Sequence, residues 1–365
     1  SSTDINYLKT VSRATPEEVY DAIIKDLEYA MEVLPVKWEN ASDGGRITSG
    51  SAAAMLAKVY LTMAGYPLKQ TDKLEKAKAI LQDFVDNKKY GAHYQLLPEY
   101  AQLFDESTGP GNEGVWIINF TRGTYGQGSL WHTEFAPLEL YYAQGIGLTY
   151  GGGWSNGLPT DRFYNSYDQE NDKRFKHTYW NSTAEIPGEY DAIVPKDANG
   201  NPQHITFYRP HIKKFREKTP NDNSQGSGLD HSIIRYADVA LSLAECLNEQ
   251  GKTSEAIEWV NKVRARAGVA LLNSNQYTQV SGQDNMRNRI RNERRWEFAG
   301  EGVNFFDEMR WKTWHETKFK SGAGLKQIWG SMQASYSWGG DYLYNWAIPR
   351  SEIQMNNNLT QNSGW

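Results

Sequence analysis

Apolar residues recur at helical spacing near the start of the chain. The run Thr15-Pro16-Glu17-Glu18 is typical of a helix start, because Thr15 can cap, Pro16 suits the first helical position and Glu18 completes a capping box. Pro35 then marks the end of the pattern. The apolar positions in between are Val19, Ile23, Leu27, Ala30 and Leu34. They predict one amphipathic helix.

Two further helices follow. Thr48 or Ser49 caps a helix that runs to Met63, the run Gly65-Tyr66-Pro67 ends it, and Asp72 opens the next helix. The pair matches the tetratricopeptide pattern, in which small and large residues at fixed offsets let two helices approach closely. The matching residues are Leu56, Ala57 and Tyr60 on the first helix, and Ala77, Leu81 and Phe84 on the second.

The same pattern returns later in the chain, so we predict a mainly α fold on a tetratricopeptide-like scaffold. Here the matching residues are Leu243, Ala244, Leu247, Ala256, Val260 and Val263. Cys246 lies on the first of these helices, and we expect it in the core. Such repeats can form a partner-binding groove or a plain scaffold, and two copies favour the scaffold.

The middle of the chain has a different composition and is rich in turn-forming residues. Within it, the apolar run 115–120 predicts a short strand. We expect one domain over residues 1–365. Its predicted parts are a helical part (1–97), a loop-rich ligand-binding insertion (98–230), a second helical part (231–320) and a C-terminal loop segment (321–365). Loops on a rigid scaffold commonly carry recognition.

Residues 290–311 interleave arginines and carboxylates with large aromatics. This mixture predicts a helix whose charges pair with one another and whose aromatics pack against a larger body. Glu293, Glu297 and Glu301 fall at intervals of four, on one face. Carboxylates paired with arginines stay ionised, so they suit a structural role better than proton transfer.

Composition and charge narrow the function classes. The 365 residues are 39% hydrophobic and 23% charged, as in a soluble globular protein. The net charge of −5 argues against nucleic acid as the main partner. The single cysteine excludes an intrachain disulfide framework and a cysteine-based zinc cluster. No apolar run approaches the roughly 20 residues of a membrane span.

Motifs of catalysis and cofactor binding are missing from the sequence. There is no Gly-x-Ser-x-Gly elbow, and Gly151-Gly-Gly-Trp154 lacks the lysine and serine of a phosphate loop. No two of the seven histidines have metal-ligand spacing, and the run 197–201 lacks the closing glutamate of a calcium loop. We therefore predict no catalytic residue, no cofactor and no metal ion.

Aromatic content points instead to ligand binding. The chain has 13 Trp, 22 Tyr and 32 Gly. A Trp or Tyr ring can stack on the apolar face of a sugar while nearby polar side chains bond its hydroxyls. The candidates in the insertion are Trp131, Tyr150, Trp154, Tyr179, Trp180 and Tyr190, with Asn156, Asp191 and Arg122 as polar neighbours, and Trp338 and Tyr342 in the tail are second choices. Burial in the core is the competing interpretation for each.

Several sequence blocks, in order along nearly the whole chain, resemble the SusD/RagB family. The blocks are Arg13-Ala-Thr-Pro-Glu-Glu-Val-Tyr20, Gly45-Arg-Ile-Thr48, Ile234-Arg-Tyr-Ala-Asp238, Asn261-Lys-Val-Arg-Ala-Arg-Ala-Gly268, Ile290-Arg-Asn-Glu-Arg-Arg-Trp-Glu297 and Ile348-Pro-Arg-Ser-Glu-Ile353. The family pattern usually begins well before the first block, with a lipidated cysteine and further helices. We therefore expect the sequence to be incomplete at its N-terminus.

The resemblance implies a non-enzymatic surface lipoprotein of the outer membrane with a tetratricopeptide-based fold. Such proteins bind a nutrient, usually a glycan, and pass it to a SusC-like TonB-dependent transporter. Because the ligand-contacting loops vary within the family, no binding residue transfers to a numbered position here.

Three other functions stay open. A RagB-like, peptide-binding member of the family would bind mixed peptides and ignore sugars. A glycoside hydrolase would release reducing ends and lose activity on substitution of one carboxylate. A helical-repeat adaptor for another protein would present apolar side chains without a sugar-sized aromatic cluster.

Overall fold

The computed structural model describes residues 5–40, 43–85, 88–122, 127–137, 154–180, 199, 210–216, 226–274, 280–319 and 338–365. Within these ranges the protein is mostly helical, as predicted. The longer helices are α2 (Pro16–Val33), α3 (Ser49–Ala64), α4 (Lys73–Gln82), α9 (Tyr236–Glu249), α10 (Thr253–Ala267), α11 (Gln283–Glu297) and α12 (Val303–Arg310).

Shorter elements complete the described chain. The short α-helices are α1 (Ile5–Leu8), α5 (Trp131–Phe135), α7 (Asp161–Tyr164), α8 (Lys173–Thr178), α13 (Trp314–Lys318) and α14 (Arg350–Met355). The 3₁₀ helices are η2 (Tyr100–Phe104), η3 (Gly111–Glu113) and η6 (Asp341–Tyr344). The strands are β1 (Gly114–Ile118), β2 (Tyr179–Trp180), β3 (His211–Ile212) and β4 (His231–Arg235).

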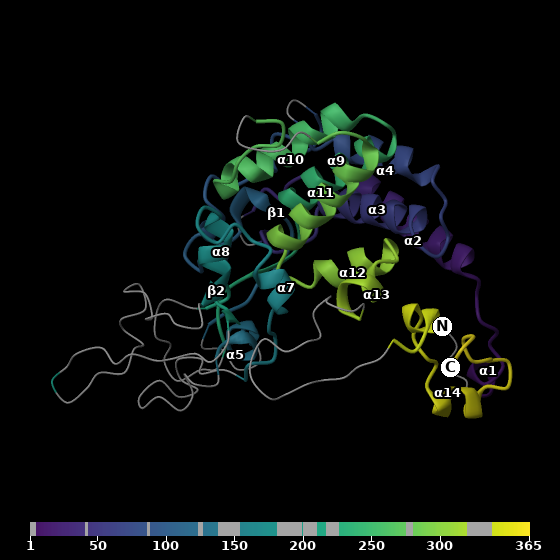
Figure 1. The fold of residues 1–365 in the computed structure, drawn as a ribbon. Coiled ribbons are helices and arrows are strands. Elements are labelled where there is room, and N and C mark those ends of the chain that lie inside the picture. The colour runs from purple at the N-terminus through teal and green to yellow at the C-terminus, as the bar shows by residue number, and fades with distance from the viewer. Residues whose placement is uncertain are drawn as a thin grey trace.

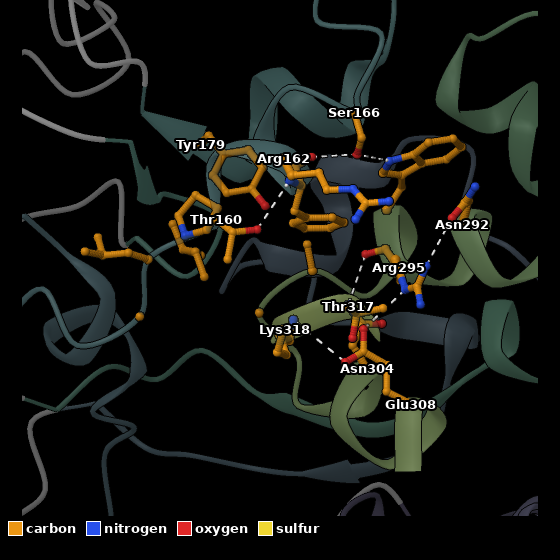
Figure 2. Close-up of a pocket in the computed structure, with 18 of the residues that line it drawn as sticks. Thr160, Arg162, Ser166, Tyr179, Asn292, Arg295, Asn304, Glu308, Thr317 and Lys318 are labelled. Carbon is orange, nitrogen blue, oxygen red and sulfur yellow. Dashed lines mark hydrogen bonds and ion pairs between the residues drawn. The ribbon is translucent and has the colours of Figure 1, made fainter. Parts of the chain in front are cut away.

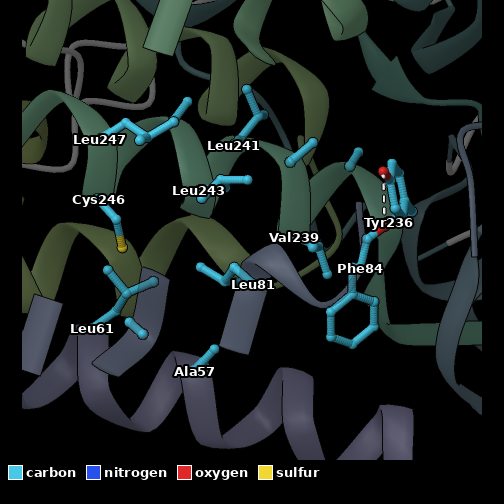
Figure 3. Packing of buried hydrophobic residues seen from close by; sticks show 14 of the residues in the cluster. Ala57, Leu61, Leu81, Phe84, Tyr236, Val239, Leu241, Leu243, Cys246 and Leu247 are labelled. Carbon is cyan, nitrogen blue, oxygen red and sulfur yellow. Dashed lines mark hydrogen bonds between the residues drawn. The ribbon is translucent and has the colours of Figure 1, made fainter. Parts of the chain in front are cut away.

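Both predicted tetratricopeptide pairs form packed helical hairpins. Helix α3 packs on α4 and α9 on α10, while α9 also lies against α4 and α11. The small residues Ala57, Ala77, Ala244 and Ala256 are all fully buried where the helices approach. Figure 3 shows the large residues of the α3–α4 and α9 helices meeting in one core, with the Cys246 side chain among them. The core around α9 therefore joins the two hairpins.

Helix α2 begins as predicted but buries a different face. The Thr15 hydroxyl accepts from the Glu18 backbone, and the Glu18 carboxylate accepts from the Thr15 backbone, which completes the capping box. The predicted apolar face included Val19 and Ile23, yet both are exposed. The residues that pack against the core are Tyr20, Ile24, Leu27 and Met31. Apolar residues on both faces made the spacing ambiguous, and contact with α3 selects one of them.

Strands β1 and β4 pair antiparallel, with Gly114 opposite Arg235 and Ile118 opposite His231. Strand β1 confirms the prediction from the apolar run at 115–120. Strand β4 corrects the prediction that a helical block starts at residue 231, because residues 231–235 are extended before α9 begins. The pairing ties the insertion to the start of the central helix.

The predicted single helix over 290–311 is two helices. Helix α11 ends at Glu297 and α12 begins at Val303. Gly300 and Gly302 between them have φ angles of +78° and +82°, in the left-handed region that glycine tolerates best. The turn places Glu301 beside the core rather than on a continuous helical face, and this residue is buried.

The described elements of the loop-rich part, and those near the two ends of the chain, lie outside the helical scaffold. In Figure 1, α5, α7, α8 and β2 gather below α10 and α11, while α1 and α14 lie near each other with the two termini. Arg13 donates to Asn362 at 2.6 Å, and Asn356 donates to the Val11 carbonyl at 2.9 Å, so the first and last segments hold each other. Within the described ranges, none of the helices is both long enough and apolar enough to cross a bilayer.

Candidate functional site

The carboxylates that stood out in the sequence lie in a buried ion-pair network. Glu297 is fully buried and contacts the guanidinium groups of Arg174, Arg235 and Arg266, with Arg235 Nη1 at 2.5 Å from its Oε1. Burial by itself would raise the pKa of Glu297, but the three arginines override it and hold the pKa well below its usual range. An ionised carboxylate enclosed in this way cannot donate a proton near neutral pH.

Neighbouring acids are paired in the same manner. Glu293 accepts from Arg174 at 2.7 Å and from Arg264 at 2.8 Å. Glu301 accepts from Lys214 at 2.7 Å. Burial lowers the pKa of Lys214 to about 8, and the Glu301 carboxylate opposes that shift. All of the basic partners named here come from outside residues 290–311, so for these three carboxylates the prediction that the stretch pairs with itself is wrong.

A second network lies where α11 meets α9 and α12, and here residues of the stretch 290–311 pair with one another. Arg294 donates to Asp307 and Asp238, each at 2.7 Å. Arg310 contacts Asp307 and also donates to Glu245. Together the two networks brace α9, α11 and α12, which agrees with the structural role predicted for these charges.

Two of the predicted binding residues lie side by side in the loop-rich part. The segment from Trp154 to Asn156 runs along α5: the Trp154 backbone donates to the Thr133 carbonyl at 2.9 Å, and the Asn156 amide donates to Glu134 at 2.6 Å. Trp154 is 44% exposed. It is therefore held at its backbone while its ring faces solvent.

Trp131 and Arg122 already have protein partners. The Trp131 ring stacks on His231 with centroids 4.3 Å apart and meets Phe215 edge-on, so one of its faces is covered. Arg122 donates to Glu106 from its Nε at 3.0 Å. Each residue supports the insertion, and a ligand would reach only the parts left open.

Tyr179 and Trp180 are in the core instead of on the surface. They form β2 and are only 5% and 1% exposed. Tyr179 packs among Tyr164, Tyr167 and Phe175, as its ring contacts show. Trp180 has no open ring for a sugar, so for this residue the competing interpretation of burial holds. Tyr179 is little exposed, but it is one of the residues that line the cavity described below.

The tail aromatics pack against the scaffold. The Trp338 ring contacts Trp314, His315 and Phe319, with the His315 ring 4.7 Å away. Tyr342 meets Trp365 at 4.9 Å. Both residues are half-buried and lie in clusters that dock the tail. The remaining predicted residues, Tyr150, Tyr190 and Asp191, lie outside the described ranges.

A cavity of about 450 Å³ lies between the insertion and α11–α13. Residues 157–160 and α7 form one wall, and side chains of α11, α12 and α13 form the other. Figure 2 shows polar groups of both walls facing it, and Phe163 and Trp296 line it with aromatic surface. Its size is within the range of small-molecule sites.

Hydrogen bonds fix the Trp296 ring in this wall. Its Nε1 donates to Ser166 Oγ at 2.9 Å, and Tyr167 donates to the Trp296 carbonyl at 2.9 Å. The backbone of Gly157 lies so close to Phe135 that an added Cβ would meet the ring at 2.1 Å. The hydrogen bonds of Trp296 hold the insertion against the scaffold, whereas the Gly157 contact lies within the insertion and packs residue 157 against α5. The segment after Trp154 leads directly into the cavity wall.

Several residues of this cavity were missed in the sequence. Arg162, Phe163, Arg295 and Trp296 belong to it. For Arg295 and Trp296 the sequence pattern indicates only a bracing role, because their neighbours alternate with carboxylates. Residues 292, 295, 296 and 299 recur at helical spacing, so they share a face of α11 and its continuation, but only the folded chain shows that this face is open.

A second cavity, of about 480 Å³, lies between α3 and β1. Trp38 and Trp116 line it. The Arg46 guanidinium lies 5.5 Å from the Trp38 ring centre and forms an ion pair with Asp43. The charge of Arg46 is therefore largely balanced by Asp43. This cavity is part of the helical scaffold and contains none of the binding residues predicted from the sequence.

The fold is thus a helical-repeat scaffold with a cavity between a loop-rich insertion and helices α11–α13, an arrangement that suits ligand binding. The family model described as the SusD family matches residues 112–365, and a second model, described as starch-binding associating with outer membrane, matches residues 1–61. The chain therefore belongs to the SusD family, as the ordered sequence blocks predicted.

Individual relatives agree with this assignment. A SusD-like protein P2 of Formosa agariphila is 28% identical over 99% of this chain and 67% of its own length. A SusD-like protein of Bacteroides ovatus is also 28% identical, over 81% of this chain and 51% of its own length. The chain thus spans between about half and two thirds of the length of these two relatives.

Solved structures share the fold. A SusD superfamily protein from Parabacteroides distasonis has a TM-score of 0.70 and 26% identity, over 97% of this chain and 70% of that chain. The surface glycan-binding protein A from Bacteroides thetaiotaomicron, solved in complex with laminarihexaose, has a TM-score of 0.71 at 20% identity, over 96% of this chain and 72% of that chain. At this identity the second match speaks for the fold alone.

Proposed function

We propose that this protein is a non-catalytic glycan-binding protein of the cell surface that delivers its ligand to a TonB-dependent outer-membrane transporter. The observation that carries the proposal is the cavity between the insertion and α11–α13, with Trp296 and Phe163 in its walls. The segment that bears the exposed Trp154 runs directly into its wall.

The chemistry of these groups suits a sugar. An aromatic ring offers a flat apolar face to a pyranose, and a few convergent polar groups fix its orientation. Asn292, Asn304 and Thr317 supply amide and hydroxyl groups in the cavity wall. Asn156 adds a polar side chain next to Trp154, although its amide already donates to Glu134.

The absence of catalysis is part of the proposal. A glycoside hydrolase ordinarily needs two carboxyl groups on opposite sides of the scissile bond. Among the described residues that line the cavity, Glu308 is the single carboxylate. The buried acids of the ion-pair network cannot supply the second one, since their side chains are enclosed by arginines.

Attachment to the outer membrane through a lipid anchor, and transfer to a SusC-like transporter, are also proposed. They are supported by the family and by the outer-membrane description of the model that matches residues 1–61. Co-purification with a transporter of that class from cells expressing both proteins would test this part, and separate elution of the two would contradict it.

Affinity electrophoresis and calorimetry of the intact chain against neutral and acidic polysaccharides test glycan binding itself. We expect binding to at least one polysaccharide without release of reducing ends. Binding of mixed peptides with indifference to every sugar would favour the peptide-binding alternative, and release of reducing ends would favour the hydrolase.

A further inference from the structure

Positive charge predominates in the walls of the cavity. The charged side chains that line it are Arg162, Arg295, Lys318 and Glu308. Glu308 is 2% exposed, and its two oxygens face Arg295 Nε at 3.3 Å and Lys318 Nζ at 3.8 Å. One carboxylate is thus shared between two cations, and the cavity has more positive than negative groups.

Arg162 has no such partner. It lies on α7, in the wall opposite α11, and makes no ion pair with any residue that the structure describes. Figure 2 shows Arg162 and Arg295 reaching toward the cavity from these two walls. Guanidinium groups bind planar or tetrahedral oxyanions through paired hydrogen bonds, so two of them on facing walls suit an anionic group between them.

Other polar atoms of the same wall have unused hydrogen-bonding capacity. Asn304 Oδ1 is buried and forms no hydrogen bond within the described part of the chain. Arg295 Nε and Glu308 Oε2 are also buried, and each has only an ion-pair contact, at 3.3 Å and 3.8 Å, in place of a hydrogen bond. Buried polar atoms normally have a hydrogen-bond partner, since an unsatisfied one destabilises the folded protein. Donors and acceptors together match a ligand that carries hydroxyls as well as an anion.

We infer that this cavity selects sugar residues that bear an anionic substituent, with Arg162 and Arg295 as the groups that recognise the charge. The inference rests on the proposed function and adds the ligand class. A uronic acid carboxylate and a sulfate ester share the required chemistry, and the experiment below separates them.

The probes are matched pairs of oligosaccharides that differ only in charge. One pair is an oligogalacturonate and its carboxyl-reduced form, and the other is a sulfated galactan oligosaccharide and its desulfated form. Binding of each to the intact chain is measured by calorimetry at low and high salt. We expect the acidic member of at least one pair to bind roughly tenfold or more tighter, because a hydrogen bond to a charged group is worth about 1.5 to 3 kcal/mol. Which pair shows the preference identifies carboxylate or sulfate.

Charge-removing substitutions place the effect in the cavity. Arg162→Gln should lower the affinity for the acidic member roughly tenfold and leave the neutral member unchanged. The matched control is Arg350→Gln, which removes the same charge from an exposed position on α14. Lys318→Gln, at the edge of the same cavity, should give a smaller loss since Lys318 already faces Glu308.

Each outcome decides the matter. If the neutral members bind as tightly as the acidic ones, or if Arg162→Gln and Arg350→Gln behave alike, glycan binding stands and the charge selection is wrong. If no member of either pair and no other glycan binds the intact chain, the proposed function fails and the inference fails with it.

Discussion

Arg310 holds the carboxylate of Glu245 with both terminal nitrogens, at 2.5 and 2.7 Å, and the Trp311 indole donates to the same carboxylate at 2.8 Å. The contact joins α12 to the middle of the scaffold at α9. Burial by itself would raise the pKa of Glu245, but Arg310 overrides burial and lowers the pKa to about 2. The contact between the two helices therefore depends on the ionised form of Glu245, and hence on pH.

This link predicts an acid-dependent loss of stability. Because the folded pKa of Glu245 lies below its ordinary value of 4.5, its contribution is complete above that pH and is lost as the pH falls from there through about 2. The difference corresponds to something on the order of 3 kcal/mol. Glu245→Gln should lower the free energy of unfolding at neutral pH and flatten its decline toward acid, as urea unfolding at about pH 7 and about pH 3 would measure. Glu258→Gln, an exposed change on α10, should leave the pH dependence unaltered.

The Glu297 network predicts a larger effect at neutral pH. Removing the carboxylate with Glu297→Ala leaves Arg174, Arg235 and Arg266 buried near one another without their shared partner. Loss of one member of a buried ion-pair network costs about 3 to 5 kcal/mol, so we expect a strongly lowered unfolding midpoint. Thermal unfolding followed by circular dichroism would measure it. A variant as stable as the parent would show that the network is not the brace we describe.

The tetratricopeptide packing predicts that enlarging two alanines of the same helix will change the stability of the protein by different amounts. Ala77 is fully buried where α4 meets its neighbours, whereas Ala79 is exposed. Ala77→Leu overfills the contact and should destabilise the protein by about 1 to 3 kcal/mol. Ala79→Leu adds the same atoms to solvent and should change stability by less than about 0.5 kcal/mol. Urea denaturation of the two variants checks the pair, and equal effects would contradict the packing.

Glycan binding should depend on Trp154. Its ring is 44% exposed next to the cavity wall, so Trp154→Ala should weaken binding with little change in stability. A stacking ring contributes about 0.5 to 1.5 kcal/mol, or roughly a two- to twelvefold change in affinity. Trp346 is 78% exposed in the C-terminal segment, and Trp346→Ala is the matched control. Comparable losses in both variants, measured by affinity electrophoresis, would place binding elsewhere.

Much of the helical scaffold could be predicted from the sequence, because its determinants are local. The capping box at Thr15 and Glu18, the glycine after α3 and the small residues at Ala57 and Ala244 act within a few residues of their own position. Helix α2 has apolar residues on two faces, and there the local spacing was insufficient to predict which face is buried. The break at Gly300 was also missed, because the charged pattern continues across it.

The binding residues were harder to predict for the same reason. The local sequence does not show whether a tryptophan ring is buried, as in Trp180, or exposed, as in Trp154. The cavity is lined by residues near 160, 295 and 318, which are far apart in the sequence. No pattern in one of these segments predicts that it will lie next to the others.

By itself, the sequence determined the helical class, the two hairpins and membership of the SusD family, since local spacing and ordered motifs encode them. The tertiary structure decided which arginine faces which carboxylate and which aromatic rings stay open. It also brought Arg162 and Arg295 to opposite walls of one cavity. Burial and charge pairing depend on residues far apart in the chain, so they exist only once the helices have packed.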